Sequence, residues 1–208
     1  MAESPARPSE EGRDSRGLKG RDLITVGIFT ALYFAVTMIP MLLAGLHPLL
    51  WVLFPGLAAV LAGIPFMLLC ARVQKPFAVL VMGVLMSLLF AMSGTIPLII
   101  ALFVGGATIA EVIRRATGYN SLWGNGAAFA FFSLGWLCSP LPIWLFHDSF
   151  MQRISQMGMP ADYVAACESI ASPLFLIVCV GFTVIGALLG VLIARTLLKR
   201  HFEKAGLA

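Results

Sequence analysis

The chain has 208 residues, of which 60% are hydrophobic and 12% are charged. Because soluble domains carry about 25% charged residues, this composition excludes an ordinary soluble domain and indicates an integral membrane protein. The formal net charge of +4 does not require a nucleic-acid partner. Basic residues that fix membrane topology beside acidic lipid account for it, so we expect contacts with lipid and none with nucleic acid.

Long apolar segments follow one another along most of the chain, and each is predicted to be a helix because lipid offers the backbone no hydrogen bonds. Most are long enough to cross a hydrocarbon core of about 30 Å, which takes about 20 helical residues. The third is short and must thin the bilayer or use flanking residues. The predicted segments are Leu23–Leu46, Leu49–Ala71, Phe77–Met92, Ile96–Ile113, Leu122–Phe146 and Ala171–Leu198.

The predicted fold is an all-α membrane protein, a bundle of six transmembrane helices. Residues 1–20 are rich in Glu, Arg, Ser, Pro and Gly and are predicted to form a disordered tail. The helical domain is expected over residues 21–200, followed by a short tail over 201–208. Pro140 and Pro142 make a regular helix unexpected at the far end of the fifth segment.

The distribution of basic residues predicts the orientation of the bundle. Of the 14 Lys and Arg residues, Arg153 alone lies in an odd-numbered connection. By the positive-inside rule both termini are therefore expected in the cytoplasm, with the first, third and fifth connections outside. The other basic residues are Arg7, Arg13, Arg16, Lys19, Arg21, Arg72, Lys75, Arg114, Arg115, Arg195, Lys199, Arg200 and Lys204.

The fifth connection, residues 147–170, is the longest and the richest in polar side chains. Phe150, Ile154 and Met157 recur at helical spacing, and a Gly and a Pro separate them from a second helical pattern. We predict two short amphipathic helices across the outer mouth of the bundle. A long ordered loop is often a lid or a binding element, and the alternative is a cap that only covers helix ends.

Few ionisable groups lie within the predicted spans. Glu111 is followed by Arg114 and Arg115 at the spacing of a helical ion pair, which we expect to extend to the inner interface. A proton relay would place charge deeper in the bilayer. His147 beside Asp148 is not accompanied by a hydrolase motif, and the chain has no phosphate-binding loop. We therefore expect no enzymatic activity, no metal site and no cofactor in this chain.

Tryptophans and cysteines allow more than one interpretation. The tryptophans lie mostly near predicted span ends, as interface anchors do, and Trp144 also adjoins the polar loop, where it could stack on a ligand. Cys138 and Cys167 lie toward the outer face. They could form a disulfide or could be small buried hydrophobic residues.

Small residues recur every fourth position in the first segment, at Gly27, Ala31 and Ala35. They share one helix face and leave a smooth groove that another helix can approach closely. The spacing alone does not distinguish a partner protein from packing within the same bundle.

Two stretches resemble a known family. The run KGRDLITVGIFTALYFAV at Lys19–Val36 resembles the opening signature of the MptD or Trep_Strep group, and Phe54–Phe77 is similar to its second block. The resemblance covers about Lys19–Lys199, although the later spans resemble the group only in layout. It implies the substrate-binding (S) component of an energy-coupling factor (ECF) transporter, in the plasma membrane of a prokaryote.

The resemblance also implies a mechanism. An S component binds a vitamin or another micronutrient near the outer face and docks on a separate transmembrane coupling protein that bears two ATPase subunits. ATP is then used by partner subunits. An Ala-xxx-Ala face on the first span commonly contacts the coupling protein. Ala31 and Ala35 match that motif, and Gly27 extends it.

Ligand residues of S components usually come from the outer connections and the outer halves of spans four to six. In the fifth connection three acidic residues oppose Arg153, which slightly favours a cationic or neutral polar substrate. The assignment is positional, because no ligand motif matches residue by residue. The candidate substrate-binding residues are Thr95, Trp144, His147, Asp148, Arg153, Tyr163 and Glu168.

Other functions fit the same composition. A stand-alone transporter or channel, formed by several copies of the chain, would move substrate without ATP or partners. A membrane scaffold protein would bind no small molecule. An intramembrane enzyme is the least favoured alternative, because the hydrolase motifs are missing.

Overall fold

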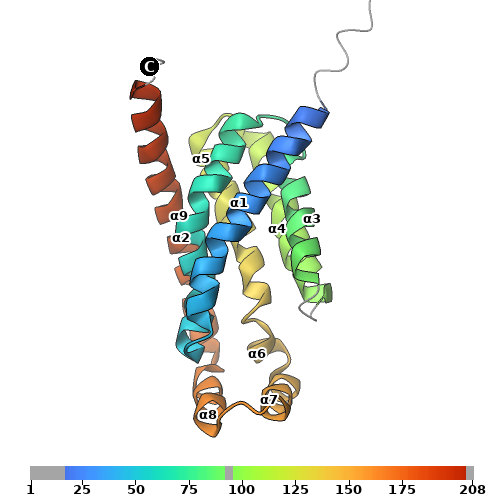
Figure 1. Ribbon diagram of the computed structural model, residues 1–208, viewed down its shortest axis with the longest axis vertical. Helices are drawn as coiled ribbons and strands as arrows, with labels where there is room; N and C mark the ends of the chain where they lie inside the picture. The colour runs from blue at the N-terminus through green and yellow to red at the C-terminus, as the bar shows by residue number, and fades with distance from the viewer. Residues whose placement is uncertain (1–16, 92–95, 205–208) are drawn as a thin grey trace, which may run out of the picture.

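The computed structural model describes residues 17–91 and 96–204, and within those ranges it contains helices and no strand. Four helices are long and apolar enough to cross a membrane. The all-helical membrane architecture expected from composition is therefore confirmed, and Figure 1 shows the arrangement of the helices. The four helices are α1 (Gly20–Ala44), α2 (Pro48–Arg72), α4 (Ile96–Thr117) and α9 (Pro173–Lys204).

Two further apolar helices are shorter than a full span. α3 (Ala78–Phe90) has 13 residues. The fifth predicted segment is not one helix, because α5 (Leu122–Ser133) gives way to the 3-10 helix η3 (Leu134–Cys138) and then to the four-residue α6 (Pro142–Leu145). The prolines after η3 explain the break, since a proline ring cannot donate a backbone hydrogen bond. A count of six spans remains a prediction.

The start of α1 and the end of α9 lie at the end of the bundle opposite the longest connection. α1 begins and α9 ends at the top in Figure 1, whereas α6, α7 (His147–Gln156) and α8 (Ala161–Ile170) lie at the bottom. We call the end of the bundle where α1 begins and α9 ends the terminal end, and we call residues 147–170 the cap. The cap consists of two short helices, as its helical spacing predicted. Which side of the membrane each end faces remains a prediction.

The tails expected over residues 1–20 and 201–208 fall largely outside the described residues. In the described part of the chain, α1 begins at Gly20, and α9 continues to Lys204, past the domain end expected at residue 200.

The closest helix approach joins α2 to α9. A Cβ atom added to Gly63 would lie 2.5 Å from the backbone carbon of Gly190, and one added to Gly190 would lie 2.6 Å from the carbonyl oxygen of Ala59. Real Cβ atoms do not approach so closely. Glycine on both helices lets the two backbones touch, which increases dispersion contacts where lipid provides no hydrophobic driving force.

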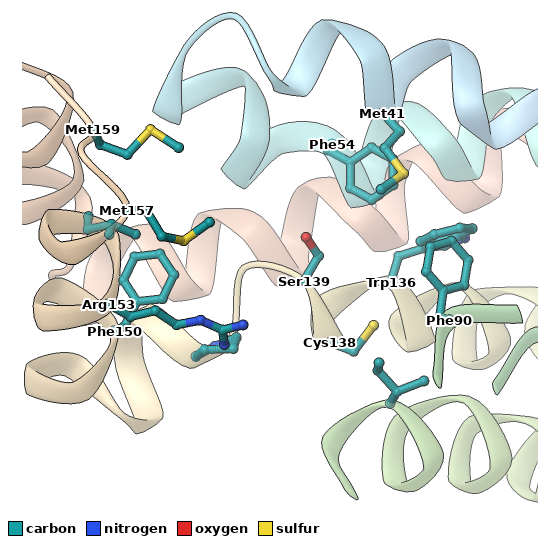
Figure 2. A pocket seen from close by; sticks show the side chains of 13 residues that line it. Met41, Phe54, Phe90, Trp136, Cys138, Ser139, Phe150, Arg153, Met157 and Met159 are labelled. Carbon is teal, nitrogen blue, oxygen red and sulfur yellow. The ribbon is translucent and has the colours of Figure 1, made fainter. Parts of the chain in front are cut away.

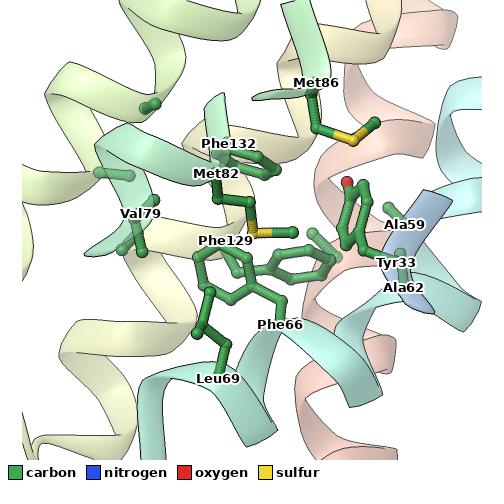
Figure 3. Close-up of a cluster of buried hydrophobic side chains, with 14 of the residues drawn as sticks. Tyr33, Ala59, Ala62, Phe66, Leu69, Val79, Met82, Met86, Phe129 and Phe132 are labelled. Atoms are coloured by element: carbon green, nitrogen blue, oxygen red, sulfur yellow. The ribbon is translucent and has the colours of Figure 1, made fainter. Parts of the chain in front are cut away.

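Aromatic rings fill the interior between the helices. Phe66 of α2 lies 4.8 Å, centroid to centroid, from Phe129 of α5 and 5.2 Å from Phe132. Figure 3 shows these rings with Tyr33 of α1 and Met82 of α3, so side chains of at least four helices meet in the cluster. Edge-to-face and tilted aromatic pairs of this kind add stabilisation beyond their buried area.

The pair formed by Glu111 and Arg114 is buried between the helices, and its depth in the membrane remains a prediction. Arg114 is 0% exposed and Glu111 8%. The Glu111 carboxylate accepts hydrogen bonds from the backbone N–H groups of Phe77, at 2.8 Å, and Val79, at 3.2 Å. It thus stabilises the start of α3, where unpaired N–H groups and the helix dipole favour negative charge.

Arg114 joins three further elements to this carboxylate. Its Nη1 lies 3.7 Å from Glu111 Oε2, its Nε donates to Asn125 Oδ1 at 2.9 Å and its Nη2 donates to the carbonyl of Val73 at 3.0 Å. Its guanidinium also lies over the ring of Tyr119. The arginine is buried because its planar donors reach acceptors on several segments at once.

We predict that Gly190→Val lowers the free energy of unfolding by about 1–3 kcal/mol, because the added methyl groups overlap the α2 backbone. Gly181→Val on the same helix is the control, since an added Cβ there meets nothing within 4 Å. The measurement is SDS-induced unfolding in mixed micelles. Equal effects of the two substitutions would contradict the close packing of α2 and α9.

We predict that Arg114→Gln lowers the free energy of unfolding by about 3–5 kcal/mol, because it leaves the buried Glu111 carboxylate without its partner. Arg115→Gln removes the same charge from an exposed neighbouring position and should change stability by less than about 0.5 kcal/mol. Arg114→Lys should fall between them if Arg114→Gln does not fold. The same unfolding midpoint for all three variants would rule out the buried network.

Candidate functional site

A cavity of about 310 Å³ lies between the membrane helices and the cap. Its volume is at the lower end of the range for small-molecule sites in proteins. We call it the cap cavity, and Figure 2 shows its walls. The side chains that line it are Met41, Phe54, Phe90, Ile99, Trp136, Cys138, Ser139, Pro142, Phe150, Arg153, Ile154, Met157 and Met159.

Trp136 of η3 forms the wall of the cavity on the side of the membrane helices. Its ring meets Phe90 edge to face at 5.0 Å and Phe54 at 5.2 Å. Its indole N–H donates to the hydroxyl of Tyr33 at 2.9 Å, and the two rings stack. These contacts fix the indole in one orientation, so the ring presents a rigid apolar surface.

The cap is attached to the bundle by a second aromatic contact. Phe150 of α7 stacks on Trp51 of α2 with centroids 5.5 Å apart and planes 6° apart. The Trp51 indole N–H donates to Ser139 Oγ at 2.9 Å. At Gly158 the chain turns from α7 toward α8 with a φ of 75°, which a residue with a side chain rarely adopts.

Among the described side chains that line the cap cavity, the charged one is Arg153. Figure 2 shows its side chain extending from α7 toward the side where Cys138 and Ser139 lie. Within the described part of the chain, its guanidinium takes part in no hydrogen bond or ion pair. The residue is exposed, so water reaches it.

The other predicted substrate residues occupy different places. His147 Nε2 lies 3.2 Å from Glu168 Oε1, which joins the two cap helices, and the Trp144 indole donates to the carbonyl of Ser172 at 3.1 Å. Tyr163 packs into the apolar core of the cap, while Asp148 is exposed in the first turn of α7. Thr95 lies outside the described residues. Of the predicted set, Arg153 therefore lines the cavity.

The aromatic wall was not among the site residues predicted from the sequence. Trp136 was interpreted with the other tryptophans as an interface anchor, yet it is 1% exposed. A signal was present in Pro140 and Pro142, which interrupt an apolar segment. Irregular backbone at membrane depth is tolerated where protein covers it or where it lines a cavity, so such a break points to a site.

Cys138 and Cys167 are both buried and unpaired in this structure. Burial raises the pKa of the Cys167 thiol, which favours its protonated form. No group of His, Cys, Asp and Glu able to hold a metal ion occurs within residues 17–91 and 96–204.

The small-residue face of α1 is not covered by the described helices. Ala31 and Ala35 are exposed, Gly27 is half-buried, and a Cβ added to Gly27 would meet nothing within 4 Å. Gly27 and Ala31 line a shallow groove of about 380 Å³ between α1 and α3. Within the described residues, packing in the same bundle therefore does not explain the spacing of these residues.

Comparisons with known proteins give one match. The sequence model of a family described as "Hypothetical bacterial integral membrane protein (Trep_Strep)" matches residues 20–204. No curated protein and no solved structure matches the chain. The family description agrees with the four membrane-spanning helices. The chain is therefore a multi-pass membrane protein that belongs to the bacterial Trep_Strep family.

Proposed function

We propose that this protein is the S component of an ECF-type importer and captures a vitamin or another small micronutrient. The observation that carries the proposal is the cap cavity, which lies at the end of the bundle opposite the start of α1 and the end of α9. The basic residues predict that this end faces outward. A cavity of this kind is suited to collecting a solute from outside the cell.

One side of the cap cavity is a fixed aromatic surface, and the other side consists of flexible side chains from the cap. Trp136 is held by Tyr33 and two phenylalanines, so it offers a ring surface that need not reorganise when a ligand arrives. Met157 and Met159 come from the cap, and their flexible side chains can fill the space that a ligand leaves. The rigid ring of Trp136 and the flexible methionine side chains of the cap together favour capture of one compact solute.

The cap supplies a route for entry and release. The stack of Phe150 on Trp51 attaches the cap to α2, and His147 beside Glu168 joins the two cap helices to each other; neither contact is covalent. Parting the Phe150–Trp51 stack would expose the cavity to the outside, and restoring it would exclude water from the bound solute. Movements of loops and lids of this size occur on the microsecond to millisecond scale.

The groove beside Gly27 and Ala31 is the proposed contact with the coupling protein. Ala35 continues this exposed face along α1. Small side chains allow a partner helix to approach the backbone of α1 closely. In this proposal the chain is not itself an enzyme, and ATP is hydrolysed by two ATPase subunits bound to the coupling protein.

We predict that the double substitution Ala31→Trp and Ala35→Trp prevents assembly with the coupling protein and ATPases, because two indole rings fill the face that a partner helix would occupy. The measurement is co-purification of the tagged chain with an ECF module co-expressed from the same bacterium. The isolated variant should keep the unfolding midpoint of the natural chain, since both side chains point away from the bundle.

Gly181→Trp is the matched control, because it adds the same ring at an exposed position of α9. It should leave assembly intact. Normal assembly of the double variant would show that the docking face is wrongly assigned. Failure of the natural chain to assemble would contradict the S-component function, and transport by the reconstituted chain alone would favour a stand-alone transporter.

A further inference from the structure

We infer that the cap cavity selects a compact, ring-bearing organic anion, a carboxylate or a phosphate, whose charged end meets Arg153. This inference rests on the proposed function, in which the cap cavity is the substrate site. It reverses the weak preference for a cationic or neutral substrate that the sequence of the fifth connection suggested.

The charge that faces the cavity differs from the charge of the whole connection. Asp148 and Asp162 are exposed and do not line the cavity, and Glu168 is paired with His147. Arg153 does line it, and within the described residues its guanidinium has no acidic partner. A solute in the cavity would therefore meet one positive charge beside apolar walls, where an anion is favoured over a cation.

Ser139, which also lines the cavity, can donate a hydrogen bond to a ligand. Ser139 Oγ accepts from the Trp51 indole, which leaves its own hydroxyl proton for a ligand. The Trp136 indole N–H is already used by Tyr33. Guanidinium and hydroxyl donors match the oxygen atoms of a carboxylate or phosphate, whereas the described lining side chains offer an ammonium group only one remaining lone pair on Ser139 Oγ and weakly accepting sulfur atoms.

The apolar walls indicate the shape of the remaining part of the solute. Phe54 and Phe90 each meet Trp136 edge to face, and Phe150 lines the cavity from the cap. Rings prefer such offset and edge-to-face neighbours, so a planar ring gains more here than a flexible chain does. The volume of about 310 Å³ limits the solute to a small ring system with its acidic group.

The test uses ring compounds in matched charge states. Benzoate, nicotinate and indole-3-acetate are compared with their amides and with the corresponding amines, and phenyl phosphate is added. Binding to the full chain in neutral detergent is measured by isothermal titration calorimetry. We expect at least one acid to bind at least tenfold more tightly than its amide and its amine.

Substitutions of Arg153 test whether its guanidinium binds the acidic group of the ligand. Arg153→Gln should weaken binding of that acid about tenfold, the loss of one charged hydrogen bond, and should leave binding of its amide within twofold. Arg153→Lys should keep part of the affinity, because the charge remains without the planar donors. Arg195→Gln removes the same charge from an exposed position near the terminal end of α9 and should have no effect.

Four results would overturn the inference. One is equal or tighter binding of an amide or amine, and another is an acid affinity that Arg153→Gln does not change. The third is the absence of binding by every acid. Competition by phosphatidylglycerol at Arg153 would assign the positive charge to a lipid headgroup and would also overturn it. Assembly with the coupling protein is measured separately, so the S-component function can survive any of these results.

Discussion

The structure depends on the requirement that a backbone surrounded by lipid satisfies its own hydrogen bonds. Helices meet this requirement along α1, α2, α4 and α9. The chain departs from it between α5 and α6, where prolines and a 3-10 turn interrupt the apolar segment. That departure is possible because neighbouring helices and the cap cover the irregular stretch. The same break places Trp136 beneath the cap and so creates the wall of the cavity.

Part of this architecture could be predicted from the sequence. Segment length and apolarity indicated the long helices, and the spacing of Phe150, Ile154 and Met157 indicated helix in the cap. The rotation of each long helix about its axis could not be predicted in the same way. Because these helices are apolar all round, no polar stripe shows which face is inside. Gly190 and Ala35, for example, are both small residues in apolar segments, although Gly190 is buried against α2 and Ala35 is exposed.

The site shows a second limit of the sequence. Arg153 was one of the candidates chosen by their position in the outer connections and span ends, and it does line the cap cavity. The acidic residues of that connection were counted with it, but the fold directs them to the surface or to His147. The summed formal charge of the fifth connection therefore does not describe the local electrostatic field in the cap cavity. What decides that field is the direction of each side chain, which follows from the packing of α7 and α8.

At the terminal end, the number of nitrogen atoms on Arg114 has a consequence of its own. Its three nitrogens face Val73, Glu111 and Asn125, which belong to three separate stretches of chain. A single ammonium nitrogen on a thin stem cannot span acceptors spread across that plane. Geometry rather than charge thus holds the end of α2 and the start of α5 beside the start of α3, as a three-armed bracket holds three beams at one joint.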